Sequence, residues 1–177
     1  MAKIRDNTSV GEIIRDGEKI VVIERANYPE SFALPAGHVD GDPNFISAVT
    51  RELEEEVGLR VDKNNIVFEE DIDNPCKREG GTHHLWKVYE ALNWSGELRA
   101  GSDAKKAVWF SKDDLQKIAA RTEYFMKKYG ISYDKVGKLT VAIFGKNPAE
   151  KATDQEWKQE MGLEPVWYYI LKKLGLI

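Results

Sequence analysis

The sequence predicts an α+β fold followed by a mainly helical C-terminal extension. Runs of β-branched and aromatic residues, separated by Gly and Pro, occupy much of residues 8–110 and indicate strands. Two stretches in which apolar residues recur every three or four positions indicate helices packed on a sheet. The final stretch contains two pairs of a polar residue followed by Pro, which are typical of helix starts. We therefore expect one domain at 1–130 and an extension at 131–177 that packs on the same domain or at a subunit interface.

A β-hairpin is predicted near the N-terminus. Two β-rich runs, at 10–14 and 20–23, flank Asp16-Gly17, a dipeptide that supplies the positive φ of a tight turn. The following stretch, 26–42, holds several Pro and Gly residues and predicts a loop with one short strand.

The first helix is predicted from Pro43 to Gly58. Asp42 is a suitable N-cap, and Pro is tolerated at the first helical position because the donor it lacks has no partner there. Gly is a common C-terminal stop. Apolar residues three or four positions apart predict the buried face of this helix: Ile46, Val49, Leu53 and Val57.

Further strands are predicted at 66–70, 82–92 and 108–110. A helix follows the last of these, with Ser111 as its N-cap and acidic residues in its first turn, where they complement the helix dipole. This helix is expected to end at Gly130.

The extension is harder to interpret. Residues 139–144 could form a strand or a buried helical turn, helices are expected to begin at 147–148 and 164–165, and Gly175 ends the last one. The tail is apolar enough for a subunit interface, which would make the protein a homodimer, and equally for packing on its own domain. The side chains concerned are Trp157, Trp167, Tyr168, Tyr169, Ile170, Leu171 and Leu174.

Charge and composition restrict the classes of partner. The chain carries 26 Lys and Arg against 30 Asp and Glu, a net charge of −4, whereas nucleic-acid-binding proteins need a basic face. No apolar run is long enough to span a membrane, and residues 1–6 hold no apolar signal core. Cys76 is the single cysteine, which excludes an intramolecular disulfide and a cysteine-based zinc site. The sequence thus favours a cytoplasmic protein with no nucleic-acid and no membrane partner.

An acidic cluster lies on the first predicted helix. Glu52, Glu55 and Glu56 stand at i, i+3 and i+4, so they project from one side of it. Like charges at these spacings repel unless they are solvated or hold a cation. A solvated acidic face is one interpretation. The other is an all-oxygen site for Mg²⁺ or Mn²⁺, to which carbonyl groups of the preceding Pro/Gly loop at 34–41 come close.

This stretch resembles the Nudix box, in which a Gly is followed at fixed spacing by a Glu and then by Arg-Glu-aliphatic-x-Glu-Glu-x-Gly-aliphatic. The matching residues are Gly37, Arg51, Glu52, Leu53, Glu55, Glu56, Gly58 and Leu59. Pro43 stands where the box has its first Glu, which in the family is mainly a supporting residue, and Asp42 could partly compensate. The resemblance covers about residues 8–128 and implies a Nudix-type α/β/α sandwich with a mixed central sheet.

The resemblance also implies an activity, the hydrolysis of the diphosphate bond in a nucleoside diphosphate linked to another group, by attack of water on phosphorus. It implies Mg²⁺, with Mn²⁺ as a substitute, held by Gly37, Glu52, Glu55 and Glu56, where the backbone carbonyl is that of Gly37 or of its neighbour. The implied catalytic residues are Arg51, Glu52, Glu55 and Asp103. Arg51 would orient Glu52 by a charge-assisted hydrogen bond.

The general base stays open between Glu52 and a carboxylate of the loop at 93–107. That loop holds Glu97 and Asp103, and Asp103 is nearer in sequence to the strand around Trp109. Its alternative interpretation is a solvated loop aspartate.

The substrate is the least determined part of the prediction. In the family, a proline near the offset of Pro75, 16 residues beyond Leu59, marks members that act on ADP-ribose and related nucleotide sugars, although an Asn-Pro turn needs no such explanation. Lys77 and Arg78 in the same loop could meet a phosphate or lie on a solvated surface. Cys76 is expected to be an inert thiol.

Other side chains have two interpretations each. Tyr28, Phe32, Trp86 and Tyr89 could stack on a base or belong to the core. His83 and His84 are adjacent on a predicted strand, so they point to opposite faces and are not expected to share a metal.

Three alternatives to a diphosphate hydrolase of this kind remain. One is a (deoxy)nucleoside triphosphate pyrophosphatase that removes damaged nucleotides, and the second is a non-catalytic module that senses nucleotides. The third is a scaffold whose extension docks a partner. The retained box carboxylates favour catalysis.

Overall fold

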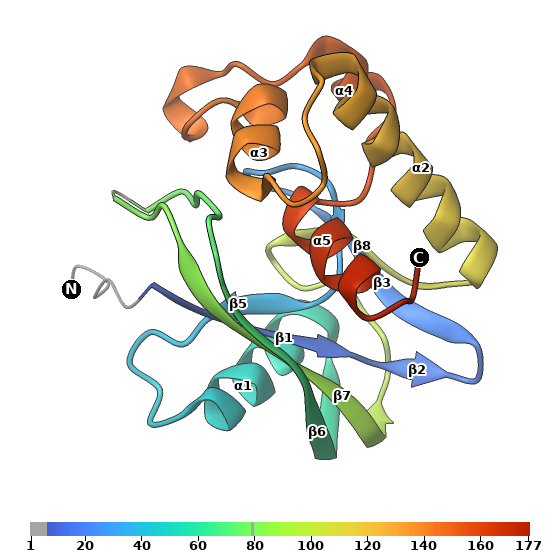
Figure 1. The fold of residues 1–177 in the computed structure, drawn as a ribbon. Helices are drawn as coiled ribbons and strands as arrows, with labels where there is room; N and C mark the ends of the chain where they lie inside the picture. The colour runs from blue at the N-terminus through green and yellow to red at the C-terminus, as the bar shows by residue number, and fades with distance from the viewer. Residues whose placement is uncertain (1–6, 79) are drawn as a thin grey trace.

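The structure is a computed structural model that describes residues 7–78 and 80–177. These residues form two four-stranded sheets with helices on both sides, which is the predicted α/β/α arrangement (Figure 1). Residues 1–6, which were used to argue against a signal segment, lie outside the described residues. Among the helices of the described residues, none is both long and apolar enough to cross a membrane.

The first sheet is mixed, as predicted, with the order β5-β1-β7-β6. Strand β1 (Thr8–Ile13) runs parallel to β7 (His84–Gly96) and antiparallel to β5 (Ala36–His38). Strand β6 (Leu59–Ile72) is much longer than the predicted 66–70. Its polar first half has little strand propensity of its own but pairs with β7 through several register shifts.

The second sheet contains β2 (Arg15–Asp16), β3 (Lys19–Arg25), β4 (Phe32–Ala33) and β8 (Ala104–Phe110). The tight turn is where it was predicted, with Gly17 at φ 60°. The predicted pairing of residues 10–14 with residues 20–23 was largely wrong, because β1 belongs to the other sheet. Only the short strand β2 pairs with β3 across the turn.

Helix α1 (Phe45–Val57) starts later than predicted. Asn44 is the N-cap and its side chain accepts a hydrogen bond from the Ser47 N–H, whereas the carboxylate of Asp42 binds an arginine instead. The buried face also differs at its first position. Ile46 is 46% exposed, and Phe45, four residues before Val49, packs against the core in its place.

Helix α2 (Lys112–Tyr129) confirms its predicted ends. Ser111 and Asp114 form a reciprocal capping box, and Gly130 ends the helix in the left-handed conformation. Leu115 and Phe125 are buried.

The extension is helical, with α3 (Val136–Phe144), the short 3₁₀ helix η1 (Pro148–Glu150), α4 (Gln155–Gln159) and α5 (Pro165–Lys173). The stretch left open between strand and helix is therefore helical. The helix starts at 147–148 and 164–165 are confirmed, the first as a single 3₁₀ turn.

Helix α5 belongs to the same hydrophobic core as the two sheets. Its Trp167 is fully buried and packs edge-on against Trp86 of β7, with ring centroids 5.7 Å apart. Gly11 of β1 makes room for it, since a Cβ there would lie 2.7 Å from the Trp167 ring. The chain itself thus buries most of the apolar side chains that were considered for a subunit interface, and the homodimer stays a prediction.

One buried carboxyl makes folding stability depend on pH. Glu12 of β1 is fully buried, and burial raises its pKa from 4.5 to about 8, although a hydrogen bond from the Asn64 side chain opposes the shift. The unfolded chain ionises this group near pH 4.5, whereas the folded protein keeps it protonated up to about pH 8. Its contribution to stability is therefore fully present below pH 4.5 and is lost as the pH rises to 8, by at most about 1.4 kcal/mol per pH unit.

The Glu12→Gln variant is expected to remove this loss. Urea denaturation at pH 5 and pH 8 should show the variant gaining stability relative to the wild type as the pH rises. Glu69→Gln, which changes an exposed carboxylate on β6 of the same sheet, is the control and should show no such trend. An equal stability difference between Glu12→Gln and the wild type at both pH values would contradict the assignment.

Candidate active site

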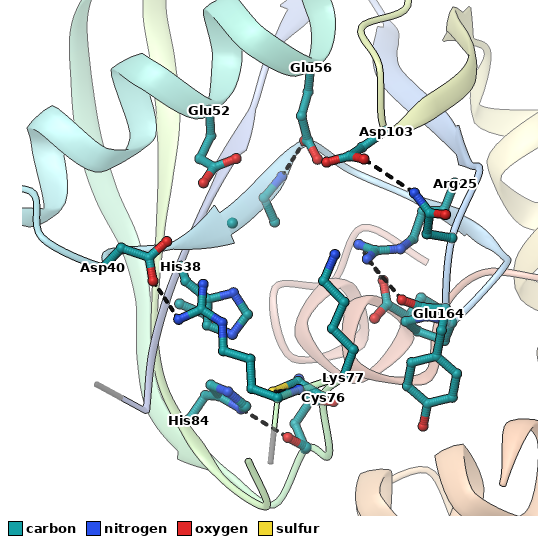
Figure 2. Close-up of a pocket in the computed structure, with 18 of the residues that line it drawn as sticks. Arg25, His38, Asp40, Glu52, Glu56, Cys76, Lys77, His84, Asp103 and Glu164 are labelled. Atoms are coloured by element: carbon teal, nitrogen blue, oxygen red, sulfur yellow. Dashed lines mark hydrogen bonds and ion pairs between the residues drawn. The ribbon is translucent and has the colours of Figure 1, made fainter. Parts of the chain in front are cut away.

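A pocket lies where α1, β5 and the end of β3 meet two loops and the start of α5. Figure 2 shows Glu52 and Glu56 reaching into it from α1, with His38, Cys76 and His84 on the opposite wall. All of the site residues predicted from the sequence line this one pocket: Gly37, Arg51, Glu52, Glu55, Glu56 and Asp103.

The three glutamates differ in exposure. Glu56 is buried and accepts a hydrogen bond of 3.0 Å from the Ala36 N–H, and Glu52 is largely buried, whereas the Glu55 side chain is 61% exposed. Burial raises the pKa of Glu56 to about 8, against the opposing effect of Arg25, and burial also raises the pKa of Glu52. Burial therefore disfavours the negatively charged form of both carboxyl groups. A cation bound between them would offset this cost.

Gly37 allows the β5 backbone to touch the Glu52 carboxylate. A Cβ at this position would lie 1.9 Å from Cδ of Glu52 and 2.0 Å from its Oε1. No side chain can occupy that volume, so only glycine lets the β5 backbone come this close to the acidic cluster.

Arg51 connects the cluster to the preceding loop. Its guanidinium donates to Glu52 at 2.9 Å, to Glu55 at 3.2 Å and to the carbonyl oxygen of His38 at 3.1 Å, and it pairs with Asp42 at 2.9 Å. This geometry agrees with the expectation that Arg51 orients Glu52. It also explains why Asp42 does not cap the helix, since its carboxylate is bound to Arg51.

Asp103 lies in the pocket, in the loop before β8, and accepts a hydrogen bond of 3.2 Å from the Asn27 side chain. The backbone of Glu97 lies instead against Gly58, at the C-terminal end of α1. Of these two candidate bases, the geometry favours Asp103.

Arg25 and Glu164 are pocket residues that no sequence pattern had singled out. The Arg25 guanidinium, at the end of β3, lies 3.8 Å from the buried carboxylate of Glu164, just before α5. Among the described residues, the Nε of Arg25 has no hydrogen-bond partner. No local sequence pattern predicts this ion pair, because its two residues are 139 positions apart. The Glu-Pro dipeptide at 164–165 predicts only the start of a helix.

The loop after β6 forms the opposite wall. Pro75, Cys76, Lys77 and Arg78 all line the pocket. Lys77 is exposed and points into the cavity (Figure 2). Arg78 is not on a solvated surface, because its guanidinium is mostly buried and paired with Asp40.

The aromatic candidates divide between the pocket and the core. Tyr28 lines the pocket, and its hydroxyl donates to the Gly145 carbonyl oxygen at 3.0 Å. Trp86 reaches the pocket but is 5% exposed, and Tyr89 is 8% exposed. Phe32 packs on Phe110, with ring centroids 5.6 Å apart. Tyr28 is therefore best placed to contact a substrate.

The donor set fits a hard divalent cation such as Mg²⁺ or Mn²⁺. Carboxylate and carbonyl oxygens are the ligands that these ions prefer. Here the carboxylates of Glu52, Glu55 and Glu56 come from one rigid helix, and the backbone of β5 passes directly beside Glu52 at Gly37. Pro43 has no part in this set, since it precedes the helix N-cap.

Comparison with known proteins agrees with the fold. A model of the NUDIX domain matches residues 5–129. ADP-ribose pyrophosphatase of Methanocaldococcus jannaschii is 34% identical over 123 residues, which are 68% of this chain and 71% of that protein. The NAD-capped RNA hydrolase NudC of Mycobacterium tuberculosis is 29% identical over 63% of this chain, but the match spans 35% of NudC.

Solved structures show the same fold. The MutT NUDIX hydrolase of Burkholderia pseudomallei has a TM-score of 0.53 and 30% identity, covering 60% of this chain and 84% of its own. The NUDIX domain of Shewanella oneidensis NrtR, solved with ADP ribose, also has a TM-score of 0.53, at 17% identity over 64% of this chain and 79% of that chain. With its α/β/α fold and helix-borne carboxylates, the chain belongs to the Nudix hydrolase family.

Proposed function

We propose that the chain is a divalent-metal-dependent hydrolase that cleaves the diphosphate bond of a nucleoside diphosphate linked to a second group, with ADP-ribose or a nucleotide sugar as substrate. The observation that carries this proposal is the grouping of Glu52, Glu55 and Glu56 beside Gly37, in a pocket that also holds Arg25. The similarity to an archaeal ADP-ribose pyrophosphatase supports the substrate class, as does the position of Pro75 in the pocket wall.

Residues of the chain itself would position the carboxylates that bind the metal. Arg51 holds the carboxylates of Glu52 and Glu55, and the Ala36 N–H holds that of Glu56, so the oxygen cluster is preorganised. When bound there, Mg²⁺, or Mn²⁺ in its place, offsets the charge of the phosphates and acidifies a water molecule.

Cleavage adds one water across the anhydride. The water oxygen bonds to phosphorus, the P–O–P bond breaks, and the second phosphate leaves. For ADP-ribose the products are AMP and ribose 5-phosphate. Either Glu52 or Asp103 accepts the proton of the water; both lie in the pocket. Arg25 and Lys77 face the cavity and supply positive charge for the diphosphate.

A substrate panel tests the proposed class. With Mg²⁺ present, ADP-ribose, NADH, diadenosine polyphosphates, an NAD-capped RNA, and normal and oxidised nucleoside triphosphates would be compared by kcat/KM. We expect ADP-ribose or a related small diphosphate to be cleaved best. Cleavage of triphosphates alone would replace the proposal by a triphosphate pyrophosphatase. Nucleotide binding without any product at millimolar Mg²⁺ or Mn²⁺ would indicate a sensing module.

The extension is proposed to contribute to this site through Glu164. This carboxylate acts on the substrate only through its ion pair with Arg25, so it is a positioning residue. Glu164→Gln is expected to raise KM for ADP-ribose about tenfold and to change kcat less, because Arg25 loses its buried partner while the carboxylate cluster is untouched.

Glu160→Gln is the matched control for this variant. Glu160 also lies in the extension and pairs with an arginine at a similar distance, 3.7 Å, but its side chain is 76% exposed. It should leave KM unchanged. Equal KM values for Glu164→Gln and the wild type would show that the ion pair has no part in binding substrate.

A further inference from the structure

A second group of metal-binding side chains faces the carboxylates from the opposite wall of the pocket. It consists of His38 at the end of β5, Cys76 in the loop after β6 and His84 at the start of β7. One ligand atom from each of the three residues lies within 4.8 Å of the other two (Figure 2). Since these side chains are not carboxylates, they differ in chemistry from the Glu52 cluster.

The strand order brings the two histidines together. β5 and β7 lie on either side of β1, and His38 pairs with Ser9 while Leu85 pairs with Thr8. The two imidazoles therefore meet at the same end of the sheet, with ring centroids 5.2 Å apart.

The His84 ring is oriented by a second contact. His84 is 2% exposed, and its Nδ1 lies 2.9 Å from the backbone carbonyl oxygen of Asn74. A carbonyl oxygen can only accept, so Nδ1 carries the proton and Nε2 is the nitrogen with the lone pair. Histidines that bind metals are commonly held in this way by a carbonyl oxygen on their other ring nitrogen.

The loop backbone encloses the sulfur of Cys76. The Arg78 N–H donates to Sγ at 3.4 Å, and the Cys76 N–H donates to the Gly81 carbonyl oxygen at 3.1 Å. A Cβ at Gly81 would lie 2.3 Å from Sγ, so this glycine lets the loop close around the thiol.

We propose that His38, Cys76 and His84 bind one Zn²⁺ ion at the pocket wall, separately from the carboxylate cluster. Two imidazoles and a thiolate suit zinc, whereas Mg²⁺ prefers oxygen ligands. Binding forms a sulfur–zinc bond, and the thiol proton leaves to solvent. In a tetrahedral zinc site the three donor atoms lie about 3.3–3.6 Å apart. The separations of up to 4.8 Å seen here would therefore shorten on binding, by about 1.5 Å at most.

Three protein ligands leave a fourth position for water. The bound ion would fasten the loop that carries Lys77 to the edge of the sheet. The single cysteine was expected to exclude a cysteine-based zinc site; the proposal departs from that expectation because two histidines would supply the other ligands.

Cobalt substitution tests this site without reference to hydrolysis. Protein stripped of metal by a chelator would be titrated with Co²⁺, whose bond to a thiolate produces a charge-transfer band in the near ultraviolet. We expect the band to saturate at one equivalent of Co²⁺, to disappear on addition of one equivalent of Zn²⁺, and to withstand excess Mg²⁺. Absence of the band at saturation would overturn the proposal.

Matched variants assign the ligands. Cys76→Ser is expected to lose the band, and His38→Ala and His84→Ala to weaken Co²⁺ binding at least about 100-fold. His83→Ala is the control, because His83 is the exposed neighbour of His84. Glu56→Gln should leave the band unchanged, since it alters only the carboxylate cluster.

A band that survives Cys76→Ser, or Co²⁺ binding that is lost in Glu56→Gln and kept in both histidine variants, would refute the assignment. Circular dichroism of the metal-free variants checks folding, and if buried His84 does not tolerate alanine, His38→Ala and Cys76→Ser decide the question. The result is independent of the proposed hydrolase activity, because the band reports bound cobalt and not turnover.

Discussion

The Glu56→Gln variant is expected to lose about 10²–10⁴-fold in kcat/KM for metal-dependent hydrolysis. A bound metal contributes several kcal/mol to stabilising charge in the transition state, and each 1.4 kcal/mol, approximately, corresponds to a factor of ten in rate. Glutamine keeps the shape of the side chain and the acceptor for the Ala36 N–H but removes the negative charge. The loss should therefore appear in the chemical step and in metal affinity, measured as the rate of product release against Mg²⁺ concentration.

The same variant should remain folded. Because burial raises the pKa of Glu56 to about 8, the metal-free protein already holds this carboxyl mostly protonated at pH 7, and a neutral amide is an acceptable substitute. We expect a melting temperature equal to or above that of the wild type. Glu54→Gln is the matched control, since Glu54 is on the same helix but exposed and paired with Arg60. Full activity in Glu56→Gln would contradict the metal-site assignment.

The Gly37→Ala variant is expected to reduce activity by a comparable factor for a steric reason. The new methyl group would lie 1.9–2.4 Å from the carboxylate atoms of Glu52. Either the Glu52 side chain leaves its place beside Arg51 or strand β5 shifts away from α1, and both outcomes break the oxygen cluster. The measurement is kcat/KM with ADP-ribose together with the apparent Mg²⁺ affinity.

Gly41→Ala provides the comparison for this effect. Gly41 lies four residues further on, in the turn after β5, and a Cβ there would meet no atom within 4 Å among the described residues. This variant should keep wild-type kinetics. Similar kinetics for Gly37→Ala and the wild type would mean that the close approach of β5 to Glu52 is not required.

Local patterns in the sequence predicted the acidic side of the site. The spacing of Glu52, Glu55 and Glu56 on a helix fixes their relative directions, and the structure brings them together with Gly37 as expected. The start of that helix was predicted two residues early. Two side chains could cap it, and which one does depends on the tertiary contact between Asp42 and Arg51.

The opposite walls of the pocket depend on pairings between distant segments. The turn at Gly17 was predictable from two residues, but the departure of β1 to the other sheet depends on β5 and β7, which follow much later in the chain. Arg25 meets Glu164 only because α5 docks on the core. No periodicity within either segment predicts the contact between Arg25 and Glu164.

Metal-dependent cleavage of a diphosphate at the Glu52 cluster is tested most directly by product analysis with ADP-ribose. The purified chain would be treated with EDTA, dialysed, and assayed with and without added Mg²⁺, and AMP and ribose 5-phosphate would be quantified. We expect both products to appear in equal amounts, EDTA to abolish them, and Mg²⁺ or Mn²⁺ to restore them. Release of AMP that is insensitive to EDTA, or no cleavage of ADP-ribose or any other diphosphate of the panel with metal present, would contradict it.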